Sequence, residues 1–327
     1  MLTRREYLAL TAQAGAVLAL PACTSAVSRG SNGSREPANV PAQGGVITRP
    51  IPKTGEPLPI VGLGSSATFS QIAASADVEA IRSVFSAMLD NGGTVFDTAP
   101  GYGASEEVAA RAVNEAGLRD RVFWATKLNV AGRGASADPV RAREQVETSL
   151  TRLGRDKADL IQVHNVADMA TQFPILEEFK QAGRVRYIGT TTTFKPQYAT
   201  LEQLMLDEPL DFIGIDYAVD NLGAEERIFP LAQERGIGVL VYLPFGRTRL
   251  WDRVEGHAVP EWAAELGATT WAQFFLKFAA SHPAVTAVTP ATSKPHHMVD
   301  NMTAAKGRLP DQAERKRMID FIAALPA

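Results

Sequence analysis

Four residues that can hold or move a proton stand between positions 97 and 164. They are Asp97 and Tyr102 in FDTAPGYG, Lys127 in FWATK and His164 in LIQVH. A lysine in an apolar segment costs free energy unless an opposite charge pairs with it, so we expect Asp97 to hold Lys127. An ammonium group beside a phenol makes the phenol a better proton donor. The set therefore predicts a site in which Tyr102 protonates a carbonyl oxygen that His164 orients.

Carbonyl reduction also needs a hydride, which none of these side chains supplies, so the site predicts a nicotinamide cofactor. A metal site is not expected, because one of the five histidines ends a predicted strand and no HxH or HExxH motif occurs. The single cysteine, Cys23, excludes an intramolecular disulfide and a cysteine-based metal site. A glycosidase with Asp97 and Asp216 as its carboxylate pair is an alternative, which the expected pairing of Asp97 with Lys127 disfavours.

The elements that must position these residues alternate along the chain. Continuous apolar runs rich in β-branched residues predict strands buried on both faces of a parallel sheet. There are eight such runs: 60–64, 94–98, 122–127, 159–164, 185–190, 211–216, 238–243 and 285–290. Helical patterns separate them, with Ser105 and Asp138 as expected N-caps and Pro139 in a first helical turn.

Eight strand–helix units in about 280 residues predict an α/β fold, a (β/α)8 TIM barrel. We expect an N-terminal β-hairpin within 46–64 and a C-terminal helix within 310–327. An open doubly wound sheet is disfavoured, because GLGSSATF after the first strand lacks a third glycine and a nearby helix start. Since barrel enzymes carry their chemistry at the carboxyl ends of the strands, the four residues above are expected to meet there.

Residues 1–45 have a different composition from the rest. Arg4 and Arg5 precede an apolar run, 7–20, which is too short to span a bilayer, and Cys23 follows it. This segment resembles a twin-arginine export signal with a lipobox, which implies the export machinery, a lipid anchor at Cys23 and a periplasmic or membrane-anchored protein. Cleavage without lipidation and a chance N-terminal tail are the alternatives. Residues 46–327 are then one barrel domain.

The overall charge and composition narrow the class of protein further. Apolar residues make up 45% of the chain, and the net charge is −3 with a pI of about 6.0. This balance is typical of a globular domain and gives no basic surface for nucleic acid.

The motifs FDTAPGYGASEEVAARAV, WATKLN, SLTRLGRDKADLIQVHN, GRVRYIGTTT and SHPAVTAVTPATSKPHHMVDN resemble those of the aldo-keto reductase superfamily. The resemblance covers about residues 47–305. It implies a barrel that binds NADP(H) and a catalytic tetrad of Asp97, Tyr102, Lys127 and His164, with Tyr102 as the general acid. The implied substrate is a small aldehyde, ketone or alcohol.

The resemblance also implies cofactor contacts. Thr191 and Thr192 take the place of the pair that holds the carboxamide, and Gly214 stands where the family often has glutamine. The other implied contacts are Tyr242 under the nicotinamide, Arg247 and Arg249 at the pyrophosphate, and Thr292, Ser293, Lys294, His297 and Asn301 around the adenosine 2′-phosphate and adenine. Because His297 replaces a common arginine, NAD(H) is the alternative cofactor.

Two functions from different classes follow. The first is an NAD(P)(H)-dependent oxidoreductase that reduces aldehyde or ketone carbonyls, or oxidises the alcohols. The alternative is a non-catalytic barrel that binds the nucleotide and senses redox state. In either, the long loop 244–269, with Trp251 and Trp262, is expected to roof an open pocket together with Tyr102.

Overall fold

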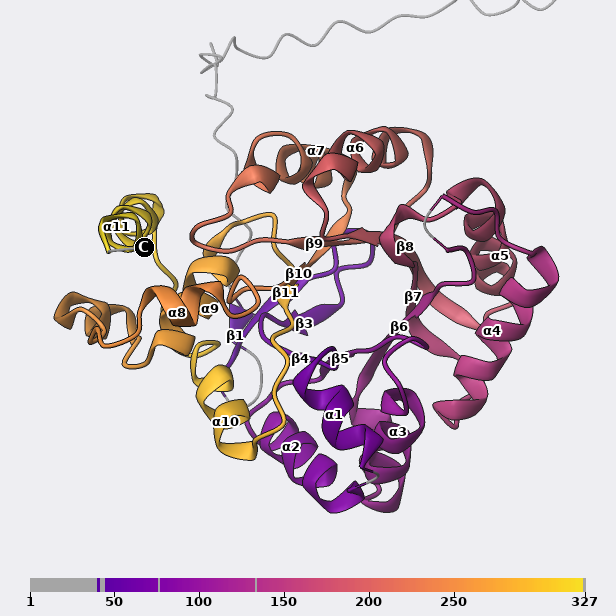
Figure 1. Ribbon diagram of the computed structural model, residues 1–327, viewed down its shortest axis with the longest axis horizontal. Helices are drawn as coiled ribbons and strands as arrows, with labels where there is room; N and C mark the ends of the chain where they lie inside the picture. The colour runs from indigo at the N-terminus through magenta and orange to yellow at the C-terminus, as the bar shows by residue number, and fades with distance from the viewer. Residues whose placement is uncertain (1–39, 42–44, 76, 133, 326–327) are drawn as a thin grey trace, which may run out of the picture. The chain divides into compact units, whose positions relative to one another are not determined.

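The computed structural model describes residues 40–41, 45–75, 77–132 and 134–325. Nearly all of the predicted export segment, with Arg4, Arg5 and Cys23, lies outside these residues. Pro37–Ala327 forms one compact unit, whose described part is drawn in Figure 1. No helix in that described part is both long enough and apolar enough to cross a membrane.

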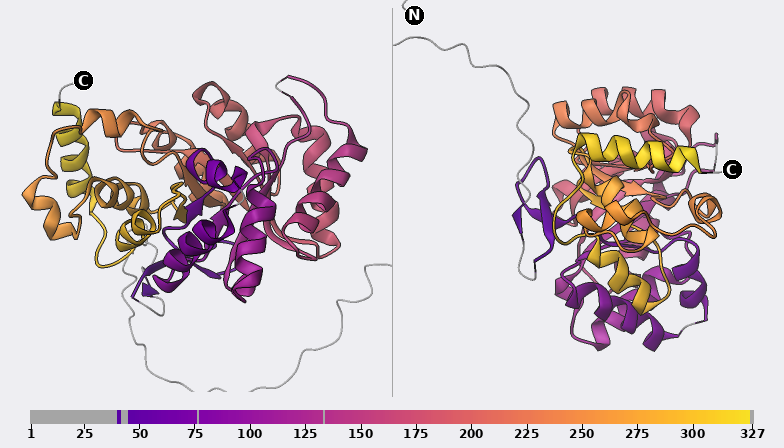
Figure 2. Two further views of the ribbon diagram at one scale, coloured as in Figure 1. Left: turned by 60° about the horizontal axis from the view of Figure 1, so that its bottom comes forward. Right: turned by 90° about the vertical axis from the view of Figure 1, so that its left-hand side faces the viewer.

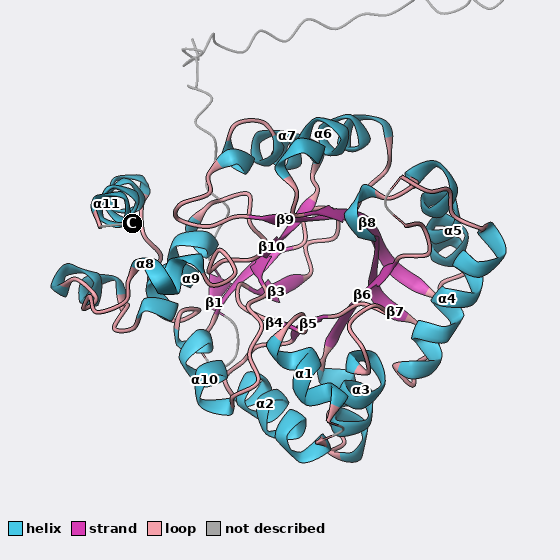
Figure 3. Ribbon diagram, viewed as in Figure 1, coloured by secondary structure: helices cyan, strands magenta, loops and turns pink. Residues whose placement is uncertain are grey.

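Parallel strands form a closed barrel at the centre of this unit (Figure 3). They are β4 Leu63–Gly64, β5 Val95–Asp97, β6 Phe123–Leu128, β7 Ala158–Val163, β8 Val185–Thr192, β9 Phe212–Asp216, β10 Gly238–Tyr242 and β11 Ala287–Val288. Neighbouring strands in the barrel are consecutive in sequence. Parallel bridges between Val61 and Val288 and between Gly64 and Ala291 join the two ends of the sheet. The predicted α/β barrel is confirmed.

Helices surround the barrel (Figure 1). Those that follow the strands are α2 Val78–Asp90, α3 Ser105–Glu115, α4 Pro139–Arg152, α5 Met169–Gln181, α6 Tyr198–Asp207, α7 Ile228–Arg235, α9 Trp271–Ser281 and α10 Pro295–Thr303. Short 3-10 turns are η1 Arg119–Arg121, η2 His164–Val166, η3 Lys195–Gln197, η4 Gly223–Glu225 and η5 Glu261–Leu266. In α4 the Asp138 side chain accepts from the N–H of Val140, and Pro139 opens the helix, as predicted.

Two predictions about helix starts were wrong. Ser105 is the first residue of α3 rather than its N-cap, because the first helical bond runs from the N–H of Val108 to the carbonyl of Ala104. A helix also follows the first strand: α1 Thr68–Ala74 begins after Ala67, which makes no side-chain cap. Buried Phe69, whose ring lies 5.3 Å from that of Phe96, packs α1 onto the barrel. Tertiary packing therefore forms a helix that has no start signal in the sequence.

An antiparallel sheet of β1 Val40–Pro41, β2 Ile47–Pro50 and β3 Pro57–Pro59 covers the amino ends of the strands (Figure 2, right). Ile51 and Leu58 beside it pack against Val95, Phe123 and Phe212, which open three of the barrel strands. The apolar side chains fill this end of the barrel, so a pocket can open only at the opposite end.

The long loop after β10 contains α8 Arg249–Arg253 and η5, and α11 Gln312–Ala324 ends the described chain. Trp262 packs on α11, with its ring 6.0 Å from that of Phe321. Arg315 of α11 donates to the hydroxyl of Tyr217 and to the carbonyl of Phe278. Trp262 is thus part of the packing between the loop and α11.

Inside the barrel the side chains change from apolar to polar along β6 and β10. On β6, Phe123 and Ala125 belong to the inner apolar cluster, and Lys127 follows two residues later. On β10, Leu240 precedes Tyr242 in the same way. Side chains two residues apart share a face of a strand, so this alternation delivers the polar groups to the carboxyl ends.

Candidate active site

The predicted pair of Asp97 and Lys127 forms at the carboxyl ends of β5 and β6. Lys127 Nζ lies 2.7 Å from Asp97 Oδ2 and also donates to the carbonyl of Thr98 at 2.8 Å. The two side chains are 1% and 5% exposed for Lys127 and Asp97 respectively. Breaking such a buried pair by removing one partner typically costs about 3–5 kcal/mol, because the remaining charge is left without compensation.

Burial and pairing act in opposite senses on these two groups. Burial has the largest effect on the pKa of Asp97 and leaves it above its usual value, although the charge and hydrogen bond of Lys127 and a hydrogen bond from Tyr242 lower it. Burial is the largest single effect on the pKa of Lys127 and lowers it, but the charge of Asp97, the hydrogen bond to Asp97 and the charges of nearby acidic groups together leave the pKa raised. Lys127 therefore stays an ammonium ion at neutral pH.

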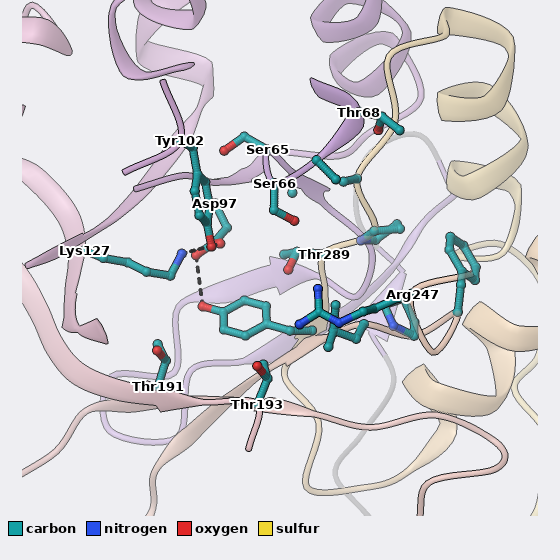
Figure 4. A pocket seen from close by; sticks show the side chains of 18 of the residues that line it. Ser65, Ser66, Thr68, Asp97, Tyr102, Lys127, Thr191, Thr193, Arg247 and Thr289 are labelled. Carbon is teal, nitrogen blue, oxygen red and sulfur yellow. Dashed lines mark hydrogen bonds and ion pairs between the residues drawn. The ribbon is translucent and has the colours of Figure 1, made fainter. Parts of the chain in front are cut away.

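Tyr102 stands beside this ammonium, in the turn between β5 and α3. Its backbone N–H donates to the carbonyl of Ala99 at 3.0 Å, which fixes the turn. Lys127 Nζ lies 5.2 Å from the centre of the Tyr102 ring. Figure 4 shows the Tyr102 hydroxyl directed toward Asp97 and Lys127. The phenol and the ammonium are thus neighbours, as the sequence predicted.

His164 closes the set from the end of β7. Its ring centre lies 6.1 Å from that of Tyr102, and the two rings are nearly perpendicular. Burial, with the charge of Lys127 second, lowers the pKa of His164 to about 3, so the imidazole is neutral at physiological pH. Its buried Nδ1 has no hydrogen-bond partner among the described residues. A neutral imidazole carries one N–H group, which can donate a hydrogen bond to a carbonyl oxygen without adding charge.

One cavity of about 630 Å³ brings these four residues together. It also holds Thr191, Tyr242 and Arg247 from the predicted cofactor contacts. Sequence reasoning missed Ser65 and Ser66, which line the cavity just after β4. Their place at the carboxyl end of the first strand was a usable signal, because active-site residues of barrels gather there.

Thr192 is not part of the cavity. Its Oγ1 donates to Gln197 Oε1 at 2.6 Å and accepts from the N–H of Phe194. Thr191 and Thr193 line the cavity instead. Successive side chains point to opposite faces of a strand, so two adjacent threonines cannot both face the same pocket. Thr192 therefore does not face the cavity as the sequence predicted, and Thr193 lines it in its place.

Of the two arginines in the GRTRL loop, one lines the cavity and the other does not, as with the two threonines. Arg249 forms a two-pronged ion pair with Asp220, at 2.5 and 2.8 Å, and does not line the cavity. Arg247, in left-handed backbone conformation, lines the cavity and extends into it (Figure 4). Of the two predicted phosphate contacts, Arg247 therefore lines the cavity and Arg249 does not.

A second cavity, of about 620 Å³, continues the groove toward α10. Thr68, Phe245, Trp251 and Ala291 line both cavities, so these residues lie where the two cavities meet. All the predicted adenosine-side residues line the second cavity: Thr292, Ser293, Lys294, His297 and Asn301. These residues and the four of the first cavity thus face one long groove.

The second cavity is also lined by a carboxylate that the sequence analysis did not predict there. Asp300 lines it and accepts from Thr270 Oγ1 at 2.8 Å and from Gln273 Nε2 at 2.6 Å. Burial, with the charges of His296 and Lys294, lowers the pKa of His297, so the ring is neutral at pH 7. Of the residues predicted to contact the adenosine end of the cofactor, Lys294 is therefore the one with a positive charge. Asp300 brings a negative charge to the same cavity.

The hydroxyl of Tyr242 makes hydrogen bonds inside the barrel, in addition to any contact of its ring with a ligand. Its hydroxyl is 3.0 Å from Asp97 Oδ1 and 2.9 Å from Gln162 Nε2. A Cβ atom at Gly214 would overlap Tyr242 Cε2, so only glycine leaves room for the ring. Gly214 thus supplies no amide, as expected from the sequence, and makes space for a neighbour.

The alternative chemistries find no site in the described part of the chain. Asp216 Oδ1 accepts from Tyr198 and Oδ2 from Asn221, and Asp216 does not line the cavity that contains Asp97. The carboxylate pair of a glycosidase is therefore not formed. No cluster of His, Cys, Asp and Glu among the described residues is arranged to hold a metal ion.

Comparison with known proteins agrees with this arrangement. The model of the aldo/keto reductase family matches residues 60–317. The aldo-keto reductase YhdN of Bacillus subtilis is 32% identical over 201 residues, which are 59% of this chain and 60% of that protein, less than two thirds of its length.

Solved structures share the fold. An aldo-keto reductase from Klebsiella pneumoniae in complex with NADPH superposes with a TM-score of 0.69 at 24% identity, over 82% of this chain and 92% of the other. An aldo/keto reductase from the same organism, in complex with NADP and acetate, has a TM-score of 0.65 at 25% identity, over 82% and 93%. The family match covers most of the sequence and includes every residue of the four-residue site, and the chain belongs to the aldo/keto reductase family.

Proposed function

We propose that this protein is an NADP(H)-dependent oxidoreductase that reduces aldehyde or ketone carbonyls or oxidises the corresponding alcohols. The observation that carries the proposal is the buried Asp97–Lys127 pair, at 2.7 Å, beside Tyr102 and His164 in one cavity. A nicotinamide bound there would supply the hydride.

The side chains account for the proton. Lys127 uses two of its three N–H donors on Asp97 and Thr98, so its charge is fixed beside the phenol. That charge favours loss of the Tyr102 proton to a substrate oxygen as negative charge develops on it. Neutral His164 donates a hydrogen bond to the same oxygen and thereby orients the carbonyl.

The groove fits a dinucleotide. Its two cavities share four lining residues, and Arg247 in the first and Lys294 in the second can meet phosphate groups. Ser65 lines the first cavity, and its buried Oγ has no hydrogen-bond partner among the described residues, so a small change of rotamer would let it bond a ligand. A relative at 25% identity is a complex with NADP, which supports NADP(H) over NAD(H) for this chain.

The test is turnover. NADPH oxidation, followed by absorbance with a panel of aldehydes, ketones and quinones, should reveal substrates. Tyr102→Phe should lower kcat by about a hundredfold to ten-thousandfold, the range of general acid catalysis, and leave NADPH binding unchanged. A non-catalytic nucleotide sensor would bind NADPH but turn over none of these compounds, and Tyr102→Phe would then change nothing.

We also propose that residues 1–45 export the protein and that 46–327, from the hairpin to α11, form one barrel domain. Arg4, Arg5 and Cys23 stand where a twin-arginine signal and a lipid anchor need them. Since that route carries folded proteins, the enzyme would leave with its cofactor bound. Cell fractionation with Arg4→Lys/Arg5→Lys, and lipid labelling of Cys23→Ala, test export and anchoring separately. Envelope protein free of nucleotide would contradict export of the loaded enzyme.

A further inference from the structure

The hydroxyl of Tyr242 is the centre of a directed chain of hydrogen bonds. An ionised carboxylate only accepts, so Tyr242 donates its proton to Asp97 Oδ1, 3.0 Å away. The tyrosine oxygen is then left to accept, and the Nε2 amide of Gln162 donates to it at 2.9 Å. Protons therefore point from Gln162 to Tyr242, from Tyr242 to Asp97, and from Lys127 to the other oxygen of Asp97.

The barrel is built around this position of the ring. A Cβ at Gly214 would overlap Tyr242 Cε2 and come within 2.7 Å of the hydroxyl oxygen. Gly214 is not among the glycines with positive φ, so the backbone does not require a glycine there. Space for the Tyr242 ring is what the missing side chain provides.

Gln162 stays in the interior at a cost. It is 0% exposed, and its Oε1 has no hydrogen-bond partner among the described residues. An unpaired buried acceptor is unfavourable, and an apolar residue would avoid it. What Gln162 provides in return is the bond from Nε2 to Tyr242.

We propose that Tyr242 and Gln162 are positioning residues for the reaction: they orient Asp97 and keep it charged, so that Lys127 stays charged beside Tyr102. This inference rests on the proposed oxidoreductase function and deepens it. Tyr242 suits the role, because burial and the negative charge of Asp97 raise its pKa well above the usual value and keep it a donor.

The other charges around the chain define the expected pH effect. Asp97 faces Lys127 and Tyr242, and Lys127 also faces Tyr102 and Glu106. The neutral ring of His164 lies within reach of the charge of Lys127. The hydrogen bond from Tyr242 lowers the pKa of Asp97, so its removal makes the carboxyl group easier to protonate. The acidic limb of the kcat profile should then move to higher pH.

The first experiment removes one oxygen. Tyr242→Phe keeps the ring and loses the hydroxyl, and we expect kcat at neutral pH to fall about tenfold, the equivalent of one hydrogen bond to a charged group. The acidic limb should move upward, and NADPH affinity should stay unchanged. Tyr187→Phe is the matched control, because the Tyr187 hydroxyl donates to Glu56 at 2.7 Å at the opposite end of the barrel. A Tyr242→Phe profile that superposes on the wild-type profile would overturn the inference.

Two further variants test the hydrogen bond from Tyr242 to Asp97 by changing residues that contact Tyr242. Gly214→Ala should displace the Tyr242 ring and reproduce the kinetics of Tyr242→Phe, and the double variant should be no slower than Tyr242→Phe alone. Gln162→Met should shift the acidic limb in the same direction but less, since Tyr242 can still donate to Asp97. Additive losses in the double variant would mean that Gly214 acts independently of Tyr242, against the inference.

A measurement without turnover separates this inference from the proposed function. The carboxyl group of Asp97 can be titrated by NMR in protein labelled with 13C-aspartate, with its signal assigned by its absence in Asp97→Asn. Tyr242→Phe should raise the titration midpoint of that signal, and Tyr187→Phe should not, even if no substrate is ever found. A midpoint unchanged by Tyr242→Phe would sink the inference and leave the oxidoreductase proposal standing.

Discussion

Lys127 and Lys277 are both almost completely buried, at 2% and 0% exposed, but their ammonium groups have different partners. Lys127 lies inside the barrel and pairs with the carboxylate of Asp97. Lys277 lies on α9 and donates to two backbone carbonyls, those of Lys306 at 2.7 Å and Arg308 at 3.0 Å. Within the described part of the chain, one lysine has a counter-ion and the other has only the dipoles of carbonyl groups.

The difference decides which lysine keeps its charge. Burial is the largest influence on both and lowers the pKa of each. For Lys127 the charge of Asp97, the hydrogen bond to Asp97 and the nearby acidic groups together reverse the effect. For Lys277 the positive charge of Arg308 adds to it, and the pKa falls to about 8. Carbonyl groups satisfy the donors of an ammonium ion, but they do not compensate its charge.

This contrast separates two uses of a buried lysine. At Lys277 the hydrogen bonds connect α9 to the segment before α11, and a neutral amine can still make part of them. At Lys127 the charge itself faces Tyr102, and a neutral amine would not assist loss of a phenol proton. A buried lysine therefore needs a counter-ion where its positive charge takes part in the reaction.

The largest effect is expected from Asp97→Asn, which removes the counter-ion of Lys127 and leaves its ammonium group with dipoles only, like that of Lys277. Losing one partner of a buried pair should lower the free energy of unfolding by about 3–5 kcal/mol. Since burial would then lower the pKa of Lys127 without a counter-ion to oppose it, the charge beside Tyr102 would be weakened, and kcat should fall at least about a hundredfold. Urea denaturation and NADPH kinetics measure the two effects.

Asp216→Asn is the control for this variant. Asp216 also ends a strand and accepts from Tyr198 and Asn221, but it lies outside the cavity. We expect its kcat to stay at the wild-type value. If Asp97→Asn retained wild-type kcat, the charge on Lys127 would not be needed for catalysis, and the contrast would lose its functional meaning.

The sequence revealed one of these lysines and not the other. Lys127 was recognisable because it interrupts an apolar strand and an aspartate ends the neighbouring strand. Lys277 stands in the helix WAQFFLKFAAS, and its partners are backbone carbonyls about thirty residues away. A carbonyl group has no residue type, so no pattern in the sequence can identify it as a partner.

The same limit explains the errors at the site. The strand order and the four central residues followed from local patterns, because a strand's end and its inward face are set by nearby residues. Arg247 and Arg249 looked equivalent, and what distinguishes them is Asp220, which comes from another loop. Tyr242 was expected from the family to cover the nicotinamide, and its bond to Asp97 needed the three-dimensional structure.

A milder test removes the unpaired charge. In Lys277→Met the pH dependence of stability should change between pH 8 and 10.5. In this window the unfolded chain keeps a proton on Lys277 and the folded protein does not, so wild-type stability rises with pH. The difference in free energy of unfolding between wild type and variant should therefore rise, by about 3 kcal/mol at most, across the window.

Thermal or urea denaturation at several pH values measures this difference, and the comparison of two proteins at each pH cancels the other titrating groups. Activity at pH 7 should not change, since Lys277 lies outside both cavities of the groove. Parallel pH profiles for the two proteins would mean that the folded protein holds the proton on Lys277 as firmly as the unfolded chain does.

The smallest effect should come from giving Lys277 a counter-ion. A Cβ atom at Gly267 would lie 3.9 Å from Lys277 Nζ, so the carboxylate of Gly267→Asp can reach the ammonium group. Gly267 has a φ of +69°, a conformation that Asp and Asn tolerate better than other side chains. Gly267→Asn is the matched control, because it has the same shape and backbone strain without the charge.

The Gly267→Asp variant should be more stable than Gly267→Asn at pH 8 by about 1 kcal/mol, as expected for a partly exposed pair. This advantage should shrink as the pH rises toward 10.5, because the ammonium group loses its proton and the pair disappears. Lys277 would then resemble Lys127, with a carboxylate rather than burial deciding its charge. An advantage that does not depend on pH would have to come from the shape or hydrogen bonds of the introduced side chain alone, and the contrast between the two lysines would then not be electrostatic.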